Sequence, residues 1–537
     1  MKFKIKKSIF LLIFSIISIS SQAQHTNNHE LRAVWITTAF NIDWPSSPNL
    51  NSNQQQQEFI DIIEKHKQNG INAIFVQIRP SAEVFYESQY EPWSHWLTGK
   101  QGKAPEPYYD PLKFMIDECH KRSIEFHAWF NPFRAVSNIE RVKTVYNHIT
   151  RQHPEWFETF GDEIKKIYFN PGIPEARNYI IKIVMEVVNK YDIDGIHFDD
   201  YFYPHNENGK SFPDYNTYLQ YNKYNLSLAD WRRDNINNFI KDLSDTINKI
   251  NPQIKFGVGP SGVWRNKTSD PEGSDTRGLA SYDQQYADVL LWLKEGWIDY
   301  VAPQIYWTIG YKIADYQKLV DWWSKHTYGK HLYIGQATHR INTTKDWKNP
   351  SEILDQIRLN RKYPQIKGSI FYSSNSLLKN PNGINDSLKY DLYFAYADVP
   401  KMEWKNVFNQ DTNLIAEADT VLNWIKISRL PQPRSPINIK SIKVRKEFLL
   451  TWEMDNNRKK LEADTGIYYK IYKFKGIYAD YISEDSFYKQ TDKKYIMISR
   501  KGKGIFRKRY TFVITAVNKQ NTESWPSESV TLKLRKE

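Results

Sequence analysis

The sequence predicts an α/β chain in which a (β/α)8 barrel of the TIM-barrel class is followed by a small all-β sandwich. Three observations support this prediction. Short apolar or β-branched runs alternate with longer helix-like stretches from residue 31 to about residue 396, as in repeated βα units. Short strand-like runs at sandwich spacing return near the C-terminus. The 537 residues suffice for a barrel of common size and one accessory domain.

Residues 1–23 show the three parts of a secretory signal peptide. A basic start precedes an apolar run over residues 9–19, and small residues lead to a cleavage position near Ala23. The run is too short for a membrane span, and no cysteine directly follows it to carry a lipid anchor. We therefore expect an exported protein, periplasmic or secreted, with no stable membrane insertion after signal cleavage.

Eight barrel strands are expected, at residues 31–37, 72–79, 124–131, 195–199, 254–261, 300–307, 331–337 and 368–374. Patterns of helical period lie between them, at residues 56–67, 175–190, 231–250, 284–293 and 352–362. These elements define a barrel domain over residues 29–397. The active site of such a barrel lies at the carboxyl ends of its strands.

The period of two along a strand separates residues that face the helices from residues that face the barrel interior. Apolar residues take the helix side in the second, third, fourth and sixth strands. The opposite parity leaves these residues inward: Gln77, Arg79, His127, Trp129, Asn131, His197, Asp199, Gln304 and Tyr306. A barrel without a site at this level would fill its interior with Val, Ile and Leu. The polar interior therefore predicts a functional site near the strand ends.

Asp199 and Asp200, at the end of the fourth strand, are the strongest candidates for acid chemistry. Glycosidic bonds are usually cleaved by two carboxyl groups. Because adjacent carboxylates disfavour double ionisation, one of this pair is expected to hold a proton near neutral pH. Glu83, after the second strand, is the candidate that acts opposite, directly or through a water. The alternative is that the two aspartates only cap a helix or hold a loop.

Aromatic and polar residues at or just beyond the strand ends indicate a sugar substrate, because pyranose faces stack on rings and hydroxyls bind polar groups. The aromatic candidates are Trp44, Tyr86, Trp93, Trp96, Trp129, Tyr201, Tyr203, Trp264, Tyr306 and Trp307. The polar candidates are Asp43, Gln77, Arg79, His127, Asn131, Arg134, His197 and Gln304. Each aromatic residue taken alone is more often a packing residue than a sugar-binding platform, so the prediction rests on their common location.

The C-terminal region is expected to comprise a linker over residues 398–430 and a β domain over residues 431–537. Strand-like runs occur at residues 440–444, 448–452, 468–474, 495–499, 510–517 and 530–534. Trp452 and the run that begins at Tyr510 resemble a fibronectin type III domain, in which a tyrosine at the place of Tyr510 makes a corner contact.

The net charge of +13 is unevenly distributed. Four lysines lie in the signal segment, and residues 430–537 carry an excess of about 12 positive charges. Basic runs at residues 458–460 and 507–509 suit an anionic cell-wall or surface polymer, or are simply solvated faces. Nucleic acid is not expected as a partner, because no binding motif occurs and the chain carries an export signal.

Several longer motifs, in order, resemble the family 10 glycoside-hydrolase-like proteins over roughly residues 29–400. They lie at residues 30–36, 76–102, 128–134, 170–172, 194–204 and 302–307. This bacterial group includes a divisome-localised hydrolase of peptidoglycan glycan strands. The resemblance implies a (β/α)8 fold and hydrolysis of a cell-wall or related amino-sugar glycan, in the first place peptidoglycan strands without stem peptides.

The fourth strand is also similar to the acid-bearing strand of family 18 chitinases and of exported enzymes that cut poly-N-acetylglucosamine. Tyr201 stands at the place of the chitinase glutamate, which weakens the case for substrate-assisted cleavage. The seventh strand ends without a carboxylate. The sequence therefore identifies no direct nucleophile, and the retaining, inverting or lytic outcome stays open.

Two alternatives remain. His127, His197, Asp199 and Asp200 are residue types that bind metals, which would suit a metal-dependent polysaccharide deacetylase. Histidines beside carboxylates inside a barrel more often tune the pKa of the acid, so no metal or other cofactor is expected. The second alternative is a non-catalytic glycan-binding barrel that the basic C-terminal domain fixes to the wall.

Overall fold

The computed structural model describes residues 29–402, 436–444, 447–454, 466–476, 486–499, 507–519, 524, 527 and 529–535. The predicted signal peptide and most of the predicted linker lie outside the described residues. Within the described part, no helix is both long and apolar enough to cross a membrane.

Eight parallel strands in the described residues close into a barrel, which confirms the predicted fold class. They are β1 (Leu31–Ile36), β2 (Ala73–Arg79), β3 (Glu125–Phe130), β7 (Gly195–Phe198), β8 (Lys255–Val258), β9 (Tyr300–Val301), β10 (His331–Gln336) and β11 (Ile366–Phe371). β9 ends before the predicted residue 307, because Pro303 has no backbone N–H to continue the ladder. Gln304 still makes isolated bridges to Ser261 and Gly335, so it stays at the barrel wall.

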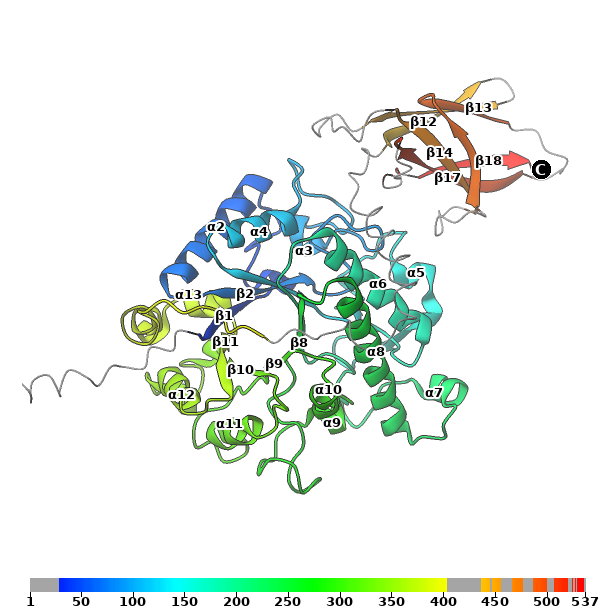
Figure 1. Cartoon of the computed structure of the whole chain (residues 1–537). Coiled ribbons are helices and arrows are strands. Elements are labelled where there is room, and N and C mark those ends of the chain that lie inside the picture. Colours follow the sequence, from blue (N-terminus) through cyan, green and yellow to red (C-terminus); the bar gives the residue numbers. More distant parts are fainter. Residues whose placement is uncertain are drawn as a thin grey trace, which may run out of the picture.

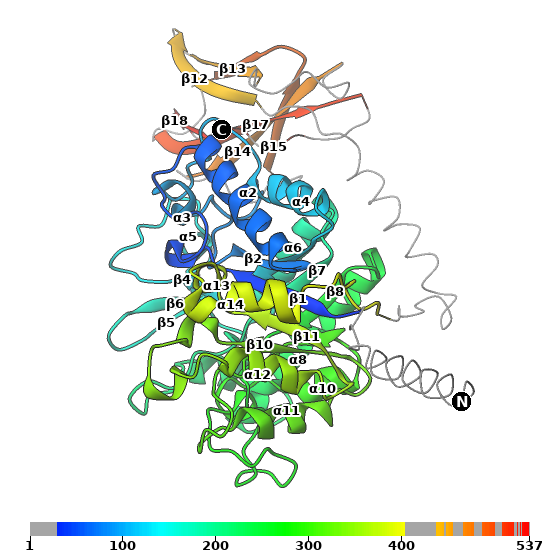
Figure 2. The same ribbon diagram turned by 90° about the vertical axis from the view of Figure 1, so that its left-hand side faces the viewer.

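Helices surround the barrel on its outside (Figure 1). The main ones are α2 (Ser52–Gln68), α4 (Pro111–His120), α6 (Pro174–Lys190), α8 (Leu228–Ile250), α10 (Val289–Lys294), α11 (Tyr316–Ser324), α12 (Glu352–Asn360) and α13 (Ser374–Leu378). Figure 2 shows α11 and α12 near the strands that they contact, β10 and β11. Buried aliphatic and aromatic residues fill the layer between strands and helices.

The predicted helix over residues 284–293 is wrong as a single element. The structure has α9 (Ser281–Gln284) and then α10, with a break between them. Asp288 explains the break, because its side chain accepts the backbone N–H of Leu291 and so begins a new helix.

A small antiparallel sheet inserted between β3 and α6 was not expected from the sequence. It contains β4 (Arg134–Val136), β5 (Phe157–Phe160) and β6 (Lys166–Phe169), in the order β4-β6-β5. Strands of three and four residues leave little periodicity to detect. This sheet matters for the site, because Arg134 begins β4.

The described strands of the C-terminal region form two antiparallel sheets, as the all-β prediction requires. β12 (Pro436–Val444), β13 (Glu447–Met454) and β16 (Tyr495–Ser499) form one sheet. β14 (Tyr468–Lys475), β15 (Phe487–Thr491), β17 (Arg507–Val517) and β18 (Val530–Arg535) form the other. Residues of both sheets, among them Leu450, Trp452, Ile471 and Ile514, share one apolar core. The fibronectin type III assignment stays a prediction.

Candidate active site

A cavity of about 300 Å³ opens at the carboxyl ends of the barrel strands. Its lining residues are Trp35, Thr37, Ala39, Phe40, Ile42, Gln77, Trp129, Arg134, His197, Asp199, Asp200, Tyr201, Gln304, Tyr306 and Tyr372. Asp199 and Asp200 are the two carboxylates among them. The size, and the mixture of rings with a few polar groups, are typical of a small-ligand site.

Asp199 follows the last residue of β7 and is almost entirely buried, with 5% of its surface exposed. Trp129 Nε1 and Asn131 Nδ2 donate to its Oδ2 at 3.2 and 3.3 Å. The backbone N–H of Tyr201 donates to Oδ1 at 3.2 Å. Burial, reinforced by the negative charge of Asp200, raises the pKa of Asp199 to about 7. Asp199 can therefore hold a proton near neutral pH.

Asp200 lies beside Asp199 but is bound differently. Gln285 Nε2 donates to the Asp200 backbone carbonyl at 2.5 Å and to its Oδ2 at 3.2 Å. Burial raises the pKa of Asp200, while the hydrogen bond from Gln285 and the nearby His205 act in the opposite direction. The pKa of Asp200 is raised overall, as is that of Asp199, and the negative charge of Asp200 helps to hold a proton on Asp199.

Aromatic rings form much of the cavity wall. Trp35 and Trp129 come from β1 and β3, and further rings follow the strand ends. Phe40 and Tyr201 are exposed, at 57% and 44% of their surface. The indole Nε1 of Trp129 is tied to the acid, so its ring is held in place. Rings on several sides of an acid suit a sugar unit that enters with one face against a ring.

A family model described as Glycosyl hydrolase-like 10 matches residues 30–353. The chain belongs to this family. It is 49% identical over 396 residues to the glycosyl hydrolase YngK of Bacillus subtilis (strain 168), a match that covers 72% of this chain and 77% of that protein. It is 39% identical over 379 residues to the glycosyl hydrolase DigH of Escherichia coli (strain K12), covering 66% of this chain and 85% of that protein.

The glycoside hydrolase domain of PgaB (BpsB) from Bordetella bronchiseptica shares 13% identity and superimposes with a TM-score of 0.43. The superposition covers 67% of this chain and 99% of the Bordetella bronchiseptica domain. The family and the two relatives support a glycoside hydrolase-like function.

In this glycosyl hydrolase-like 10 chain, the cavity brings together many of the residues that the sequence singled out. They are Gln77, Trp129, Arg134, His197, Asp199, Asp200, Tyr201, Gln304 and Tyr306. Asn131 lies behind them and reaches the site through its hydrogen bond to Asp199. Most of these residues belong to strands or strand ends, where the period of two fixes the direction of a side chain.

Glu83, the candidate for the group opposite Asp199, does not line the cavity. Its buried carboxylate accepts hydrogen bonds from Ser94 Oγ, His95 Nδ1 and Gln101 Nε2, at 2.8, 2.9 and 2.8 Å. Burial acts to raise the pKa of Glu83, but these hydrogen bonds and His95 lower it overall. This ionised and fully occupied carboxylate organises the loop after β2, so the geometry does not support a catalytic role for it.

Asp43 also lies outside this cavity. Its Oδ2 accepts the Thr37 backbone N–H at 2.7 Å. Its Oδ1 accepts Ser373 Oγ at 2.8 Å and the Asn375 backbone N–H at 2.7 Å. Asp43 thus joins the loop after β1 to the loop after β11, which is a structural task rather than the expected contact with substrate.

Arg79 is buried away from the cavity as well. Its Nε and Nη2 pair with both carboxylate oxygens of Glu91 at 2.7 and 2.6 Å, and its Nη1 donates to the backbone carbonyls of Asn131 and Pro132. The register between β2 and β3 shifts between Gln77 and Arg79. That irregularity ends the alternation on which the inward assignment of Arg79 rested.

The other predicted substrate contacts outside the cavity lining are Trp44, Tyr86, Trp93, Trp96, His127, Tyr203, Trp264 and Trp307. Apart from His127, which lies in the barrel interior, they pack into or against the core between strands and helices. Trp44 is fully buried and donates from Nε1 to the backbone carbonyl of Gln55. Loop residues have no fixed period, so the sequence could not separate packed rings from exposed ones.

Trp35 and Tyr372 line the cavity but were missed as site residues. A usable signal existed for both. Trp35 alternates with the helix-facing Val34 and Ile36 of β1, and Tyr372 directly follows β11 with the parity of Ile370, which lies in the barrel interior. The alternation applied to the second, third, fourth and sixth strands would have found both, had it been extended to the first and the last.

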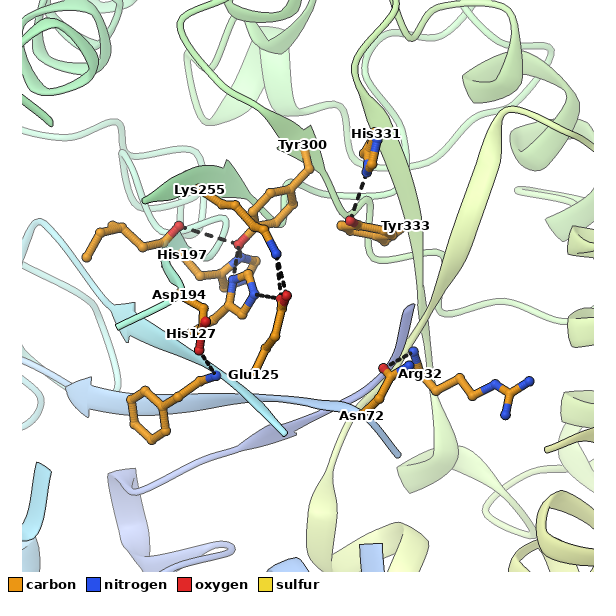
Figure 3. Close-up of polar contacts among 12 residues, drawn as sticks. Arg32, Asn72, Glu125, His127, Asp194, His197, Lys255, Tyr300, His331 and Tyr333 are labelled. Atoms are coloured by element: carbon orange, nitrogen blue, oxygen red, sulfur yellow. Dashed lines mark hydrogen bonds and ion pairs between the residues drawn. The ribbon is translucent and has the colours of Figure 1, made fainter. Parts of the chain in front are cut away.

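A chain of hydrogen bonds runs through the barrel interior to His197 of the cavity (Figure 3). Trp35 Nε1 donates to His197 Nε2 at 3.1 Å, and His197 Nδ1 lies 3.3 Å from the Tyr300 hydroxyl. That hydroxyl lies 3.2 Å from His127 Nδ1. His127 Nε2 lies 3.3 Å from Glu125 Oε2.

The two ends of this chain fix the direction of every bond in it. Burial lowers the pKa of His127 and of His197, so both rings are neutral near pH 7. An indole N–H only donates, which leaves the His197 proton on Nδ1. The carboxylate of Glu125, paired with Lys255 at 2.6 Å, only accepts, which places the His127 proton on Nε2. Tyr300 then accepts from one ring and donates to the other.

Replacing Glu125 with glutamine is expected to disturb the tautomer of His127. An amide can donate as well as accept, so the glutamine can donate to His127 Nε2 and leave the proton of that ring on Nδ1, while the Tyr300 hydroxyl donates to the Ile196 backbone carbonyl, 3.4 Å away. Nitrogen-15 NMR of labelled histidine should show only the Nε2–H form of His127 in the wild type and a mixture in Glu125→Gln, while Trp35 keeps His197 in the Nδ1–H form in both.

Lys255→Gln is the matched control, because it removes the ion pair with Glu125 but keeps the carboxylate. It should leave His127 in the Nε2–H form. A single, unchanged tautomer in Glu125→Gln would contradict the assignment.

The donor set does not fit a metal site of the kind that a deacetylase needs. Within the described residues, no group of three His, Cys, Asp or Glu side chains converges as metal ligands would. Both ring nitrogens of His197 are engaged by Trp35 and Tyr300. His127 lies deeper, between Tyr300 and Glu125. The two histidines therefore serve the interior hydrogen-bond chain.

Proposed function

We propose that this protein is an exported glycoside hydrolase that cleaves peptidoglycan glycan strands lacking stem peptides. One observation carries the catalytic part of the proposal. Asp199 is a buried acid with a pKa raised to about 7, in a cavity walled by aromatic rings. A general acid works best when its pKa lies near the operating pH.

Asp199 is the group that would protonate the leaving glycosidic oxygen. Trp129 and Asn131 hold its Oδ2, and the Tyr201 backbone holds its Oδ1, so the carboxyl group is fixed in direction. Burial raises the pKa of Asp199 to about 7, so a large share of the molecules near neutral pH hold the proton that a substrate oxygen would accept.

Asp200 supplies the negative charge of the pair. An oxocarbenium-like transition state carries positive charge on the sugar ring, and a nearby carboxylate stabilises it. Asp200 is the other carboxylate among the lining residues, and Gln285 fixes it through both its backbone and its side chain. The pair therefore divides the work that two separated carboxyl groups perform in most glycosidases.

The wall rings and the size of the cavity support an amino-sugar glycan as substrate. A volume of about 300 Å³ suits a sugar unit. Family membership supports hydrolysis, and the resemblance stated above supports a cell-wall glycan. The signal-like segment over residues 1–23 supports export.

The C-terminal domain is proposed to contact an anionic wall or surface polymer. Among its described lysines, several are exposed, including Lys440, Lys443, Lys489, Lys493 and Lys533. Exposed cations attract a polyanion at low and moderate ionic strength.

Mass spectrometry of products tests substrate and bond together. Purified protein is incubated with peptidoglycan that carries stem peptides and with strands from which an amidase has removed them. New saccharide fragments from the stripped strands alone are expected. Binding of stripped strands without any new reducing end or anhydro product would refute hydrolysis and favour a glycan-binding protein.

The rate of hydrolysis is expected to fall as the pH rises through about 7, because Asp199 acts in its protonated form.

Asp200→Asn removes a neighbouring negative charge that raises the pKa of Asp199, so the Asp199 carboxyl should titrate at a lower pH in that variant. Carbon-13 NMR of labelled aspartate measures the titration of the Asp199 carboxyl without needing turnover. If the titration midpoint of Asp199 were the same in Asp200→Asn as in the wild type, the charge of Asp200 would not be what raises the pKa of Asp199.

A further inference from the structure

Arg134 is the one lysine or arginine among the residues that line the cavity. It begins β4, the strand of the inserted sheet that the sequence did not predict. Its Nε and Nη2 donate to the backbone carbonyl of Pro80 at 3.0 and 2.8 Å. Its guanidinium carbon lies 5.4 Å from the centroid of the Tyr201 ring. The cation is thus held from two sides before any ligand arrives.

Within the described residues, the Nη1 side of the Arg134 guanidinium has no hydrogen-bond partner. The bonds to Pro80 use the edge formed by Nε and Nη2. Within the described residues, Nη1 makes no hydrogen bond or ion pair. A planar guanidinium offers a second pair of N–H groups along its Nη1–Nη2 edge, which matches a carboxylate. The side chain is only half-buried, so this edge can meet a ligand in the cavity.

The charges around the cavity restrict where an anionic ligand group can lie. The negative charge of Asp200 raises the pKa of Asp199, and the positive charge of Arg134 lowers it. An anion near the two aspartates would be repelled, whereas an anion beside Arg134 would be attracted. Within the cavity, the charges therefore favour a negative substituent beside Arg134 over one beside Asp200.

We propose that Arg134 binds the free carboxylate of a muramic acid unit and so selects strands without stem peptides. The proposal deepens the proposed function and rests on it. Once the peptide is removed, the lactyl ether of muramic acid ends in a carboxylate, which pairs with the Nη1–Nη2 edge. A stem peptide converts that carboxylate into an amide, which removes the charge and adds bulk. Arg134 is then a specificity-determining residue.

The test compares two substrates that differ only at this group. One is stripped peptidoglycan strands, and the other is the same strands with the lactyl carboxyl reduced to an alcohol. The wild type should cleave the native strands with a kcat/KM about ten- to a hundredfold higher, the range for a charge-assisted hydrogen bond. In Arg134→Gln the ratio should fall to near one. Arg134→Lys should give an intermediate ratio, since it keeps the charge but not the planar edge.

Arg151→Gln is the matched control. Arg151 is exposed on α5 (Ile149–Gln152), and its Nε donates to Thr144 outside the cavity. This variant should keep the wild-type ratio. Because the readout is a ratio between two substrates, a general loss of activity in Arg134→Gln does not imitate the expected result.

Binding of both substrates to Asp199→Asn, with and without Arg134→Gln, is measured in parallel by calorimetry. A carboxylate preference in binding that disappears with Arg134→Gln would support the inference even if no bond is cut, in which case only the hydrolytic function fails. If the wild type cleaved the two substrates with equal kcat/KM, and Asp199→Asn bound them with equal affinity, the inference would be overturned. A preference that survives Arg134→Gln, or no binding of either substrate, would overturn it too.

Discussion

Asp199→Asn is expected to reduce glycan hydrolysis by about 10²- to 10⁴-fold, the contribution of a positioned general acid. Asparagine has nearly the shape of the carboxyl group but no proton to give to the leaving oxygen. The folded state should survive, because the asparagine side chain is neutral like the protonated acid that it replaces. Release of reducing ends from stripped strands measures the loss, and thermal unfolding measures the fold.

Glu83→Gln is a useful companion, since Glu83 is also a buried carboxylate but lies outside the cavity. It should weaken the loop that contains Ser94 and Gln101, and reduce hydrolysis much less than Asp199→Asn does. Asp199→Asn protein that folds, binds glycan and still cleaves at the wild-type rate would show that another group is the acid.

Glu91→Gln is expected to destabilise the barrel by about 3–5 kcal/mol, the cost of leaving one partner of a buried ion pair without its counter-charge. The Arg79 and Glu91 side chains are both 0% exposed, and two hydrogen bonds at 2.7 and 2.6 Å join them. Urea unfolding followed by tryptophan fluorescence measures the change in the free energy of unfolding.

Asp117→Asn provides the comparison. It breaks the ion pair between Lys113 and Asp117, whose side chains are 66% and 46% exposed, and should cost less than about 1 kcal/mol. Equal effects of the two variants would argue against a structural ion pair at Arg79. If Glu91→Gln kept full stability but lost glycan binding, that result would support the prediction that Arg79 contacts the substrate.

Much of the fold could be predicted because parallel strands that are buried on both faces need continuous apolar runs. The eight predicted strands correspond to β1, β2, β3, β7, β8, β9, β10 and β11, with most ends within a few residues. The sheet β4-β6-β5 was missed because its strands are too short for a period. The break before α10 was missed because a capping aspartate inside an apolar run resembles an ordinary polar face.

The period of two identified site residues where the strands are regular. It placed Trp129, His197 and Asp199 correctly at the cavity. It also placed His127 inward. Because His127 precedes Trp129 by two residues, it lies one layer deeper in the barrel and does not reach the cavity. At Arg79 the shift in register removed the alternation, and the side chain turned to Glu91 instead.

The sequence by itself determined the barrel and the acid-bearing strand, because both follow from local patterns of apolar and polar residues. Only the tertiary structure decided which carboxyl groups reach the cavity. Glu83 and Asp43 are bound by residues of neighbouring loops, whereas Asp199 is buried beside Asp200 and near Arg134. Burial and the distance between charges depend on segments far apart in the chain, so the proton on Asp199 and the open edge of Arg134 could be assigned only from the folded structure.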